Sequence, residues 1–317
     1  YAFQNIAAIG LVGTDYELAR LEWCSVPVFE TLAKANGDII VGLKVRMGLP
    51  QFAVLGIEPL LRARQAADRC GIPIMVHIAW PPPAIEEVLE HLRPGDIVTH
   101  CATGLGMRLL DDGGKVRDIA RQARERGIRF DIGHGSGSFS FATAEAFLEQ
   151  GFVPDTISTD AHQHSQLGPM FDLPTCMTKM LALGLDLPTV VRMTTVRPVE
   201  ILGLPDDIGT LRAGARADIG VFEMLEGAFR LFDFSLAERV SPQMLVNRAT
   251  VKDGRLWEPP RPAPPAPWMT VTADQALWWA ARMQDPRAPH WEYLTRPDQF
   301  DEPTPVERDA TPLPREA

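Results

Sequence analysis

Five residues of this sequence combine a chemically versatile side chain with a position at the end of a short apolar stretch. They are Lys44, His77, His100, His134 and Asp160. The stretch Ile39–Met47 is rich in Ile, Val and Leu, which is typical of a parallel strand covered on both faces. In an α/β barrel, reactive groups come from the carboxyl ends of the strands. Two imidazoles, a carboxylate and an amine at one barrel mouth would form a ligand set suited to zinc or a similar divalent ion.

Lys44 and Arg46 end a stretch, Ile39–Met47, that otherwise has the composition of a buried strand. Side chains two positions apart on a strand share a face, so both cations should project into the same space. Taken alone, the stretch fits two cations that reach solvent or pair with distant carboxylates. Considered together with the other strand-end residues, Lys44 could instead take part in a metal site. A desolvated lysine loses its proton readily. The neutral amine can then react with carbon dioxide to give a carbamate, an anion whose two oxygens can bridge two metals.

The segments that must position these residues alternate between apolar strands and amphipathic helices, which predicts βαβ units and a parallel sheet. Strands are expected at 2–10, 39–47, 73–77, 96–100, 128–134 and 155–160. Helices are expected at 28–36, 57–70, 84–92, 115–126, 141–150, 174–183 and 188–202. Gly37, Gly71 and Gly127 follow three of these helices and are typical C-terminal caps. The chain is therefore predicted to have an α/β fold.

The composition changes twice after this alternation, which predicts three parts: 1–203, 204–257 and 258–317. The second part has short strands at 209–211, 217–222 and 250–256, with Asp253-Gly254 as a hairpin signal, and is expected to form a small β-sandwich segment. The third part is rich in Pro and Trp. It is expected to contain one helix over 272–283, with Thr272 and Gln275 as a capping box, and disorder beyond Pro297.

Charge and cysteine content exclude several classes of partner. The net charge is −10 and the pI is near 5.2, so neither nucleic acid nor an anionic membrane would be attracted to this surface. The four cysteines form no CxxC pair, which fits a reducing cytoplasm, and no apolar run approaches the ~20 residues that span a bilayer. We expect a cytoplasmic protein with a small-molecule substrate. The tail tryptophans suit packing or subunit contacts, and we expect a homo-oligomer.

The strand-end residues, together with several local motifs, resemble the amidohydrolase superfamily, and more closely its deacetylase group near dihydroorotases and D-aminoacylases. The resemblance covers about residues 1–257, and only the combination of motifs is specific. The motifs are Gly-Leu-Lys-Val-Arg-Met at 42–47, Val-Thr-His-Cys at 98–101, Phe-Asp-Ile-Gly-His-Gly at 130–135, Ser-Thr-Asp-Ala-His at 158–162, and Gly-Thr-Leu at 209–211 leading to Gly-Ala-Arg-Ala-Asp-Ile at 214–219.

The resemblance implies a distorted (β/α)8 barrel with two divalent cations, zinc by preference, and a metal-bridging hydroxide. Lys44 would be the carboxylated bridge, formed with CO2, and His77 and His100 would bind one metal. Asp160 would bind the other metal and pass a proton from the hydroxide to the leaving group. Arg46 would stabilise the oxyanion. Such a site hydrolyses amides or esters without a side-chain nucleophile, because bound metal lowers the pKa of water to about 7.

One departure from the family pattern concerns its first strand, which ends in a His-x-His pair. No such pair precedes Lys44 here, and His162 and His164 have the spacing but follow Asp160. With six expected strands in place of eight and a first residue other than Met, the sequence is expected to lack the first two βα units. If the protein itself is truncated, open barrel edges and at most one well-formed metal site are expected.

Four further residues each have two interpretations. His134 and Gly135 belong to a glycine-rich turn that either approaches the substrate or is purely structural. His162 either contacts substrate or hydrogen-bonds within its loop. Cys101 is more easily understood as a packed small residue than as a nucleophile, because nothing nearby is placed to act as its base.

The predicted function is hydrolysis of amide or ester bonds, most plausibly by a deacetylase of small N-acyl or O-acyl carboxylic acids. A cyclic amidase of the dihydroorotase type is the enzymatic alternative. A non-catalytic remnant that lacks its second metal site is the alternative from another class.

Overall fold

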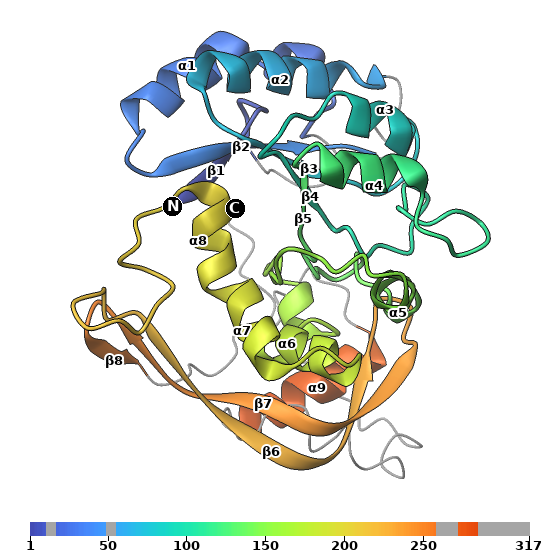
Figure 1. The fold of residues 1–317 in the computed structure, drawn as a ribbon, viewed down its shortest axis with the longest axis vertical. Coiled ribbons are helices and arrows are strands. Elements are labelled where there is room, and N and C mark those ends of the chain that lie inside the picture. Colours follow the sequence, from blue (N-terminus) through green and yellow to red (C-terminus); the bar gives the residue numbers. More distant parts are fainter. Residues whose placement is uncertain (11–16, 49–54, 258–271, 285–317) are drawn as a thin grey trace, which may run out of the picture.

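The computed structural model describes residues 1–10, 17–48, 55–257 and 272–284. Its centre is a parallel sheet of five strands that follow one another in chain order (Figure 1). The strands are β1 (Ala2–Asn5), β2 (Ile40–Arg46), β3 (Ile74–His77), β4 (Ile97–Thr99) and β5 (Arg129–Phe130). This succession, with helices between the strands, confirms the predicted α/β class.

The helices of the first half cover one face of the sheet (Figure 1). They are η1 (Leu21–Trp23), α1 (Val26–Ala35), α2 (Glu58–Cys70), α3 (Ile85–Glu90) and α4 (Asp118–Glu125). Leu43 and Val45 of β2 are fully buried and share an apolar core with Leu60 of α2. Because successive side chains of a strand point to opposite faces, Lys44 and Arg46 lie on the face away from these helices.

The predicted sixth strand, 155–160, is reduced to a single bridge between Asp131 and Thr156. The segment still runs beside the end of β5, since the Ile132 amide donates to the Thr156 carbonyl and the His134 amide to the Ser158 carbonyl. Its hydroxyls bind the Asp131 carboxylate. The expectation of a regular strand was wrong, but the position of Asp160 at the end of this segment follows from the same pairing.

Helices α5 (Phe141–Glu149), α6 (Leu173–Ala182), α7 (Leu187–Thr194) and α8 (Val196–Leu202) follow, with the short helix η3 (Ser165–Leu167) between α5 and α6. The predicted single helix over 188–202 is in fact two helices that meet at Thr195. Pro198 explains the break, because a proline ring clashes with the carbonyl four residues earlier in a continuous helix, here that of Thr194.

A second sheet consists of three antiparallel strands, β6 (Ile219–Phe232), β7 (Glu238–Lys252) and β8 (Arg255–Trp257). The predicted hairpin at Asp253 and Gly254 is confirmed, and both residues have positive φ, +49° and +74°. The sequence indicated only short strands here, whereas β6 and β7 form a long ribbon that curves beneath α6 (Figure 1). No strand forms at 209–211.

The ribbon shares one core with the rest of the chain, since Phe229 and Met244 belong to the same apolar cluster as the strands of the parallel sheet. The division into parts at 203 and 257 therefore stays a prediction. Helix α9 (Ala273–Gln284) is present as expected, and its capping box is confirmed: the Gln275 amide donates to Thr272 Oγ1, and the Thr272 amide to Gln275 Oε1, both at 3.1 Å. Residues 258–271 and 285–317, and with them the disorder expected beyond Pro297, lie outside the described residues. None of the described helices is long and apolar enough to cross a membrane.

Candidate metal centre

Strand β2 places two of the predicted site residues on the inner face of the sheet. Lys44 pairs in register with Met75, and Arg46 pairs with His77, so Arg46 and His77 are neighbours across two strands. His77 in turn pairs with Thr99, the residue before His100. The carboxyl ends of β2, β3 and β4 therefore bring Lys44, His77 and His100 to one rim.

The two imidazoles of His77 and His100 contact each other edge to face, with ring centroids 4.4 Å apart and planes at 80°. His77 Nε2 is buried and has no hydrogen-bond partner among the described residues. Burial, with smaller effects from His100 and Lys44, holds the pKa of His77 well below its usual range. The ring is therefore neutral at pH 7, with an unused buried nitrogen, and such an atom is costly unless a ligand satisfies it.

The orientation of His100 is fixed by the backbone around it. Its φ is +63°, and its Nδ1 lies 2.5 Å from the Gly133 carbonyl oxygen. A carbonyl can only accept, so Nδ1 carries the proton and Nε2 keeps its lone pair in the neutral ring. Burial lowers the pKa of His100 to about 4, which keeps it neutral. Gly133 is required here, because an added Cβ would lie 2.2 Å from Thr99 Oγ1.

Asp160 ends the segment that follows β5, and its backbone is also in the left-handed region, with φ +48°. Non-glycine residues with positive φ are uncommon and cluster at functional sites. Burial lowers the pKa values of both Lys44 and His100, and the Asp160 carboxylate partly opposes this shift. It packs against the backbone of Gly135, where an added Cβ would lie 2.9 Å from Asp160 Oδ2. Asp160 thus faces the same space as Lys44 and His100.

Burial lowers the pKa of Lys44 to about 8, although Asp160, Asp131 and Glu17 each act to raise it. An ordinary lysine has a pKa near 10.4 and is almost entirely protonated at pH 7. At a pKa of about 8, a substantial fraction of Lys44 is a neutral amine in mildly alkaline solution. This is the form that can react with carbon dioxide.

Asp131 is a buried carboxylate that connects segments of the rim. The sequence pattern did not single it out as functional. It is 3 % exposed and accepts hydrogen bonds from the hydroxyls of Thr99 at 2.7 Å, Thr156 at 2.6 Å and Ser158 at 2.7 Å. Burial raises its pKa, which the three hydroxyls oppose. Asp131 therefore joins the strand end that carries His100 to the segment that carries Asp160.

We expect Asp131→Ala to lower the free energy of unfolding by at least about 3 kcal/mol, because three hydroxyl donors lose their acceptor and each buried donor left unsatisfied costs about 1–3 kcal/mol. Urea denaturation followed by circular dichroism measures this. Asp118→Ala, which alters an exposed acidic residue at the start of α4, is the control and should change stability by less than about 0.5 kcal/mol. An Asp131→Ala variant as stable as the control would show that the carboxylate does not clamp the rim.

Arg46 has an unexpected partner in Glu17. The Glu17 carboxylate is fully buried, lies 3.4 Å from Arg46 Nη1 and accepts a 2.6 Å hydrogen bond from Asn5 Nδ2. The sequence reasoning missed Glu17, because it lies in a stretch without helical or strand periodicity. The ion pair holds the Arg46 guanidinium near the rim and leaves its Nε buried and unpaired among the described residues.

The three residues predicted to bind substrate differ in their surroundings. His134 is 1 % exposed, and both ring nitrogens contact protein atoms: Nδ1 the Gly135 carbonyl at 2.8 Å, and Nε2 the Lys179 ammonium at 2.7 Å. This arrangement supports the structural reading of the glycine-rich turn, and substrate contact by His134 or Gly135 stays a prediction. His162 is exposed; partial burial of its ring lowers its pKa, the nearby Asp160 opposes this shift, and its role also stays a prediction.

His162 and His164 face each other with ring centroids 6.1 Å apart, within the loop after Asp160. Cys101 is fully buried, and burial raises its pKa well above the usual range. A thiol in this state is a packed side chain and a poor nucleophile at neutral pH.

The donor set fits a divalent cation in its chemistry. His77 Nε2 is an orphaned buried atom, the His100 tautomer leaves Nε2 unprotonated, and Lys44 is a desolvated amine. Within the described residues, no three His, Cys, Asp or Glu side chains gather closely enough to hold a metal by themselves. Among the described residues, His77, His100 and Asp160 therefore do not form a ligand set by themselves, and their coordination of a metal together with Lys44 stays a prediction.

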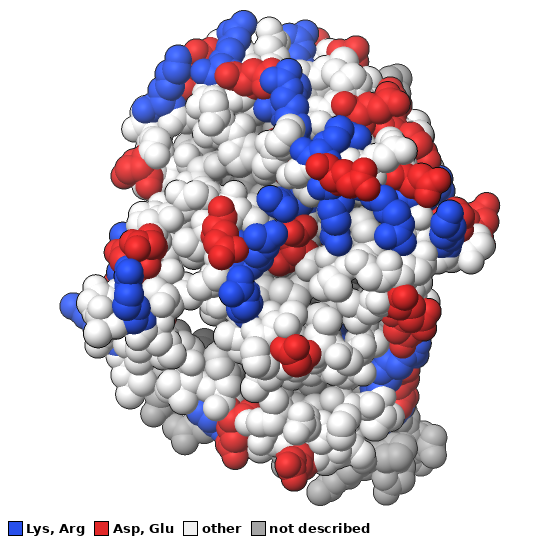
Figure 2. All heavy atoms as spheres, viewed as in Figure 1, with Lys and Arg blue, Asp and Glu red and all other residues white. Residues whose placement is uncertain are grey.

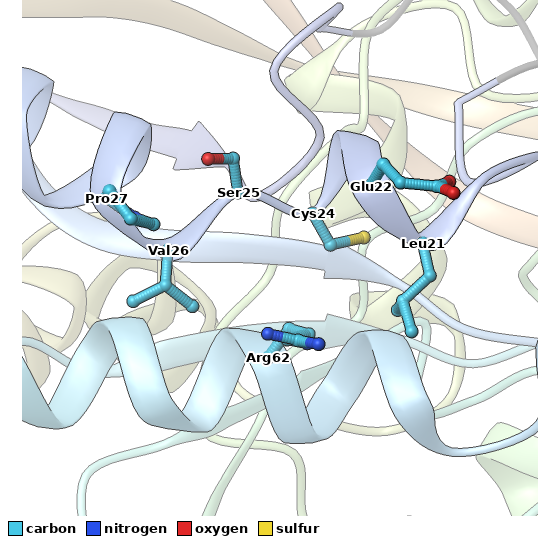
Figure 3. A pocket seen from close by; sticks show the side chains of 7 residues that line it. All are labelled: Leu21, Glu22, Cys24, Ser25, Val26, Pro27 and Arg62. Atoms are coloured by element: carbon cyan, nitrogen blue, oxygen red, sulfur yellow. The ribbon is translucent and has the colours of Figure 1, made fainter.

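A cavity between the η1–α1 segment and α2 is lined by none of the predicted site residues (Figure 3). Its volume is about 310 Å³, and it is lined by Leu21, Glu22, Cys24, Ser25, Val26, Pro27 and Arg62. Burial raises the pKa of the Cys24 thiol to about 11, so this thiol is a poor nucleophile at neutral pH. On the face shown in Figure 2, basic and acidic side chains are interspersed, and no extended basic patch is visible there.

The chain is similar to several known proteins. The model of the amidohydrolase family matches residues 42–240. A protein of Brucella anthropi named deacetylase is 36% identical over 234 residues, which cover 73% of this chain and 58% of the relative. A deacetylase of Enterococcus faecalis is 34% identical over 261 residues, which cover 81% of this chain and 70% of the relative. The chain thus spans less than two thirds of the Brucella protein.

Two solved structures share the fold. The crystal structure of an adenine deaminase is 34% identical and superposes with a TM-score of 0.77, covering 81% of this chain and 70% of that one. The crystal structure of a dihydroorotase is 34% identical with a TM-score of 0.75, covering 84% of this chain and 70% of that one. The parallel sheet is therefore part of a TIM-type barrel.

Proposed function

The chain belongs to the amidohydrolase family, and from this premise we propose that it is a metal-dependent hydrolase that removes a small acyl group from an N-acyl or O-acyl carboxylic acid. The observation that carries the proposal is the meeting of His77, His100, Lys44 and Asp160 at one rim, with His77 Nε2 buried and unpaired among the described residues. The named deacetylases support the choice of acyl substrate.

The metal would be held by His77 and His100 through Nε2, by Lys44 as its carbamate, and by Asp160. We expect zinc, and two cations in a complete site of this family. When bound, a divalent cation polarises a carbonyl and lowers the pKa of water to about 7.

Residues of the chain would carry out proton transfer, stabilisation of the developing charge and substrate binding. Asp160 would take the proton of the attacking water and deliver it to the leaving nitrogen or oxygen, as a general base and then a general acid. Arg46, held by Glu17 at 3.4 Å, would stabilise the charge that develops on the substrate oxygen. His100 would keep its Nδ1 proton on the Gly133 carbonyl throughout, so that its other nitrogen remains a ligand. His162, exposed beside Asp160, would contact the substrate.

A cyclic amidase is the second candidate, and the dihydroorotase structure with a TM-score of 0.75 favours it. Both reactions use the same rim and differ in the loops that receive the substrate. A direct comparison of turnover on acetylated amino or hydroxy acids and on dihydroorotate separates them. The candidate of another class, a non-catalytic remnant, predicts one metal or none and no turnover on any of these compounds.

Removal of metal is expected to abolish activity reversibly. Because the cation contributes several kcal/mol to transition-state stabilisation, dialysis against a chelator should lower kcat/KM at least about 100-fold. Addition of zinc should restore it, and magnesium, which binds poorly to imidazole ligands, should not. Metal content is measured in parallel. Undiminished turnover in protein shown to contain no metal would contradict the proposal.

Formation of the carbamate is expected to depend on pH and on carbon dioxide. The pKa of Lys44 is lowered to about 8, so its neutral fraction increases as the pH rises through this value. At constant dissolved CO2, the rate at which metal-free protein regains activity with zinc should increase about tenfold from pH 7 to pH 9. Stopping the CO2 supply should slow recovery. A recovery rate independent of both pH and CO2 would show that Lys44 does not form the proposed carbamate.

A further inference from the structure

Lys179 is a buried cation whose function the proposed reaction does not explain. It lies in α6, is 1 % exposed, and packs near the rings of Phe139 and Phe141, at 5.7 and 5.9 Å from their centroids. Lysine is almost never this buried without specific partners. Burial lowers its pKa to about 8, and Asp172 and Asp233 only partly oppose this.

The three contacts of the Lys179 ammonium connect three separate segments. Its Nζ lies 2.7 Å from His134 Nε2, 2.7 Å from the Pro169 carbonyl oxygen and 2.6 Å from the Phe232 carbonyl oxygen. An ammonium has three N–H groups, and all three are used. One side chain thus ties together the turn after β5, the loop that follows Asp160, and the end of β6.

The turn at residues 133–135 supports two of the predicted metal ligands. The Gly133 carbonyl accepts from His100 Nδ1, and Gly135 packs against the Asp160 carboxylate. The His134 and Gly135 amides donate to the carbonyls of Ser158 and Thr159, the two residues before Asp160. Any displacement of this turn would move both His100 and Asp160.

The hydrogen-bond acceptors around His134 and Lys179 determine which of their atoms carry protons. His134 Nδ1 lies 2.8 Å from the Gly135 carbonyl oxygen, so Nδ1 must carry the proton. Burial keeps the His134 pKa well below its usual range, so the ring is neutral and Nε2 accepts from the ammonium. The contact is therefore a directed hydrogen bond that orients the His134 ring and, with it, the turn.

We propose that Lys179 is a positioning residue: through His134 it holds the turn at residues 133–135 in the arrangement that presents His100 and Asp160 to the metal. This inference rests on the proposed function. A role in packing alone would affect stability without affecting metal affinity beyond what the loss of stability explains. Partners outside a metal's ligands typically alter its affinity 10–100-fold, which sets the expected effect.

The test compares Lys179→Met with Thr178→Val in the whole protein. Thr178 is the neighbouring buried residue of α6; its hydroxyl donates to the Pro174 carbonyl and accepts from the Leu245 amide, and neither contact reaches the turn. Zinc affinity is measured by competition with a chromophoric chelator, and thermal stability by circular dichroism. We expect Lys179→Met to weaken zinc binding about 10–100-fold and Thr178→Val to leave it within about twofold, although both lower the melting temperature.

Equal zinc affinity in Lys179→Met and wild type would overturn the inference while leaving the proposed function intact. Failure of the wild type to bind zinc would refute the proposed function, and the inference with it. Should Lys179→Met not fold, ¹⁵N NMR of histidine-labelled wild type still decides, with His134→Asn used to assign the signal. The Nδ1-protonated tautomer of His134 is expected, and the Nε2-protonated tautomer would overturn the inference.

Discussion

Replacing Lys44 by methionine is expected to lower kcat/KM by about 1,000-fold or more. Methionine keeps the length and much of the volume of the side chain but cannot form a carbamate. Loss of this ligand would remove most of the several kcal/mol that a bound cation contributes, and about 4 kcal/mol corresponds to this factor at 1.36 kcal/mol per tenfold. Turnover of an acetylated amino acid and metal content per chain are measured on the same samples.

The matched control for this variant is Lys115→Met, which removes an ammonium whose side chain is 67% exposed and pairs with Asp118 of α4. It should retain wild-type turnover and metal content. If Lys44→Met binds zinc and turns over substrate like this control, Lys44 is not a ligand of the metal.

Asp160→Asn is expected to lower kcat by about 10²–10⁴-fold at saturating zinc, because proton transfer by a positioned side chain contributes this much. The amide is nearly isosteric but cannot accept and release the proton. Asn also tolerates positive φ better than most residues, so the backbone at φ +48° should be preserved. The measurement is kcat at a zinc concentration where metal occupancy equals that of the wild type.

The control for this variant is Asp172→Asn, which changes the N-cap of α6, where the carboxylate accepts from the Thr175 amide. It should affect stability more than kcat. Unchanged kcat in Asp160→Asn would assign the proton transfer to another residue.

Much of the fold could be predicted because most elements obey simple periodic rules. The apolar run of β2 and the glycine stop at Gly71, whose φ is +67°, marked their elements correctly. The predicted sixth strand failed because its Thr and Ser hydroxyls bind Asp131 instead of extending a ladder. The long β6–β7 ribbon was underestimated, because its charged residues and its turn near Leu236 interrupt the alternation that marks a strand.

The candidate site could be predicted where residues follow strands, since strand ends meet at one rim whatever lies between them. The position of Lys44, His77, His100 and Asp160 at this rim was predicted in this way, and their role as ligands stays a prediction. Glu17 and Lys179 were missed for a physical reason: their partners, Arg46 and His134, are distant in sequence and are brought to them only by the packing of the chain. Buried charges of this kind have no local sequence pattern. The only weak signal is the position of Lys179 on the apolar face of α6.

The most direct test of the account is a crystal structure of the zinc-loaded protein with an anomalous difference map at the zinc edge. The account predicts a peak about 2.0–2.2 Å from Nε2 of His77 and Nε2 of His100, with Lys44 carboxylated and Asp160 among the ligands. A map without a peak between these side chains, or with its only peak at a different cluster, would contradict the central claim that this rim is a metal centre.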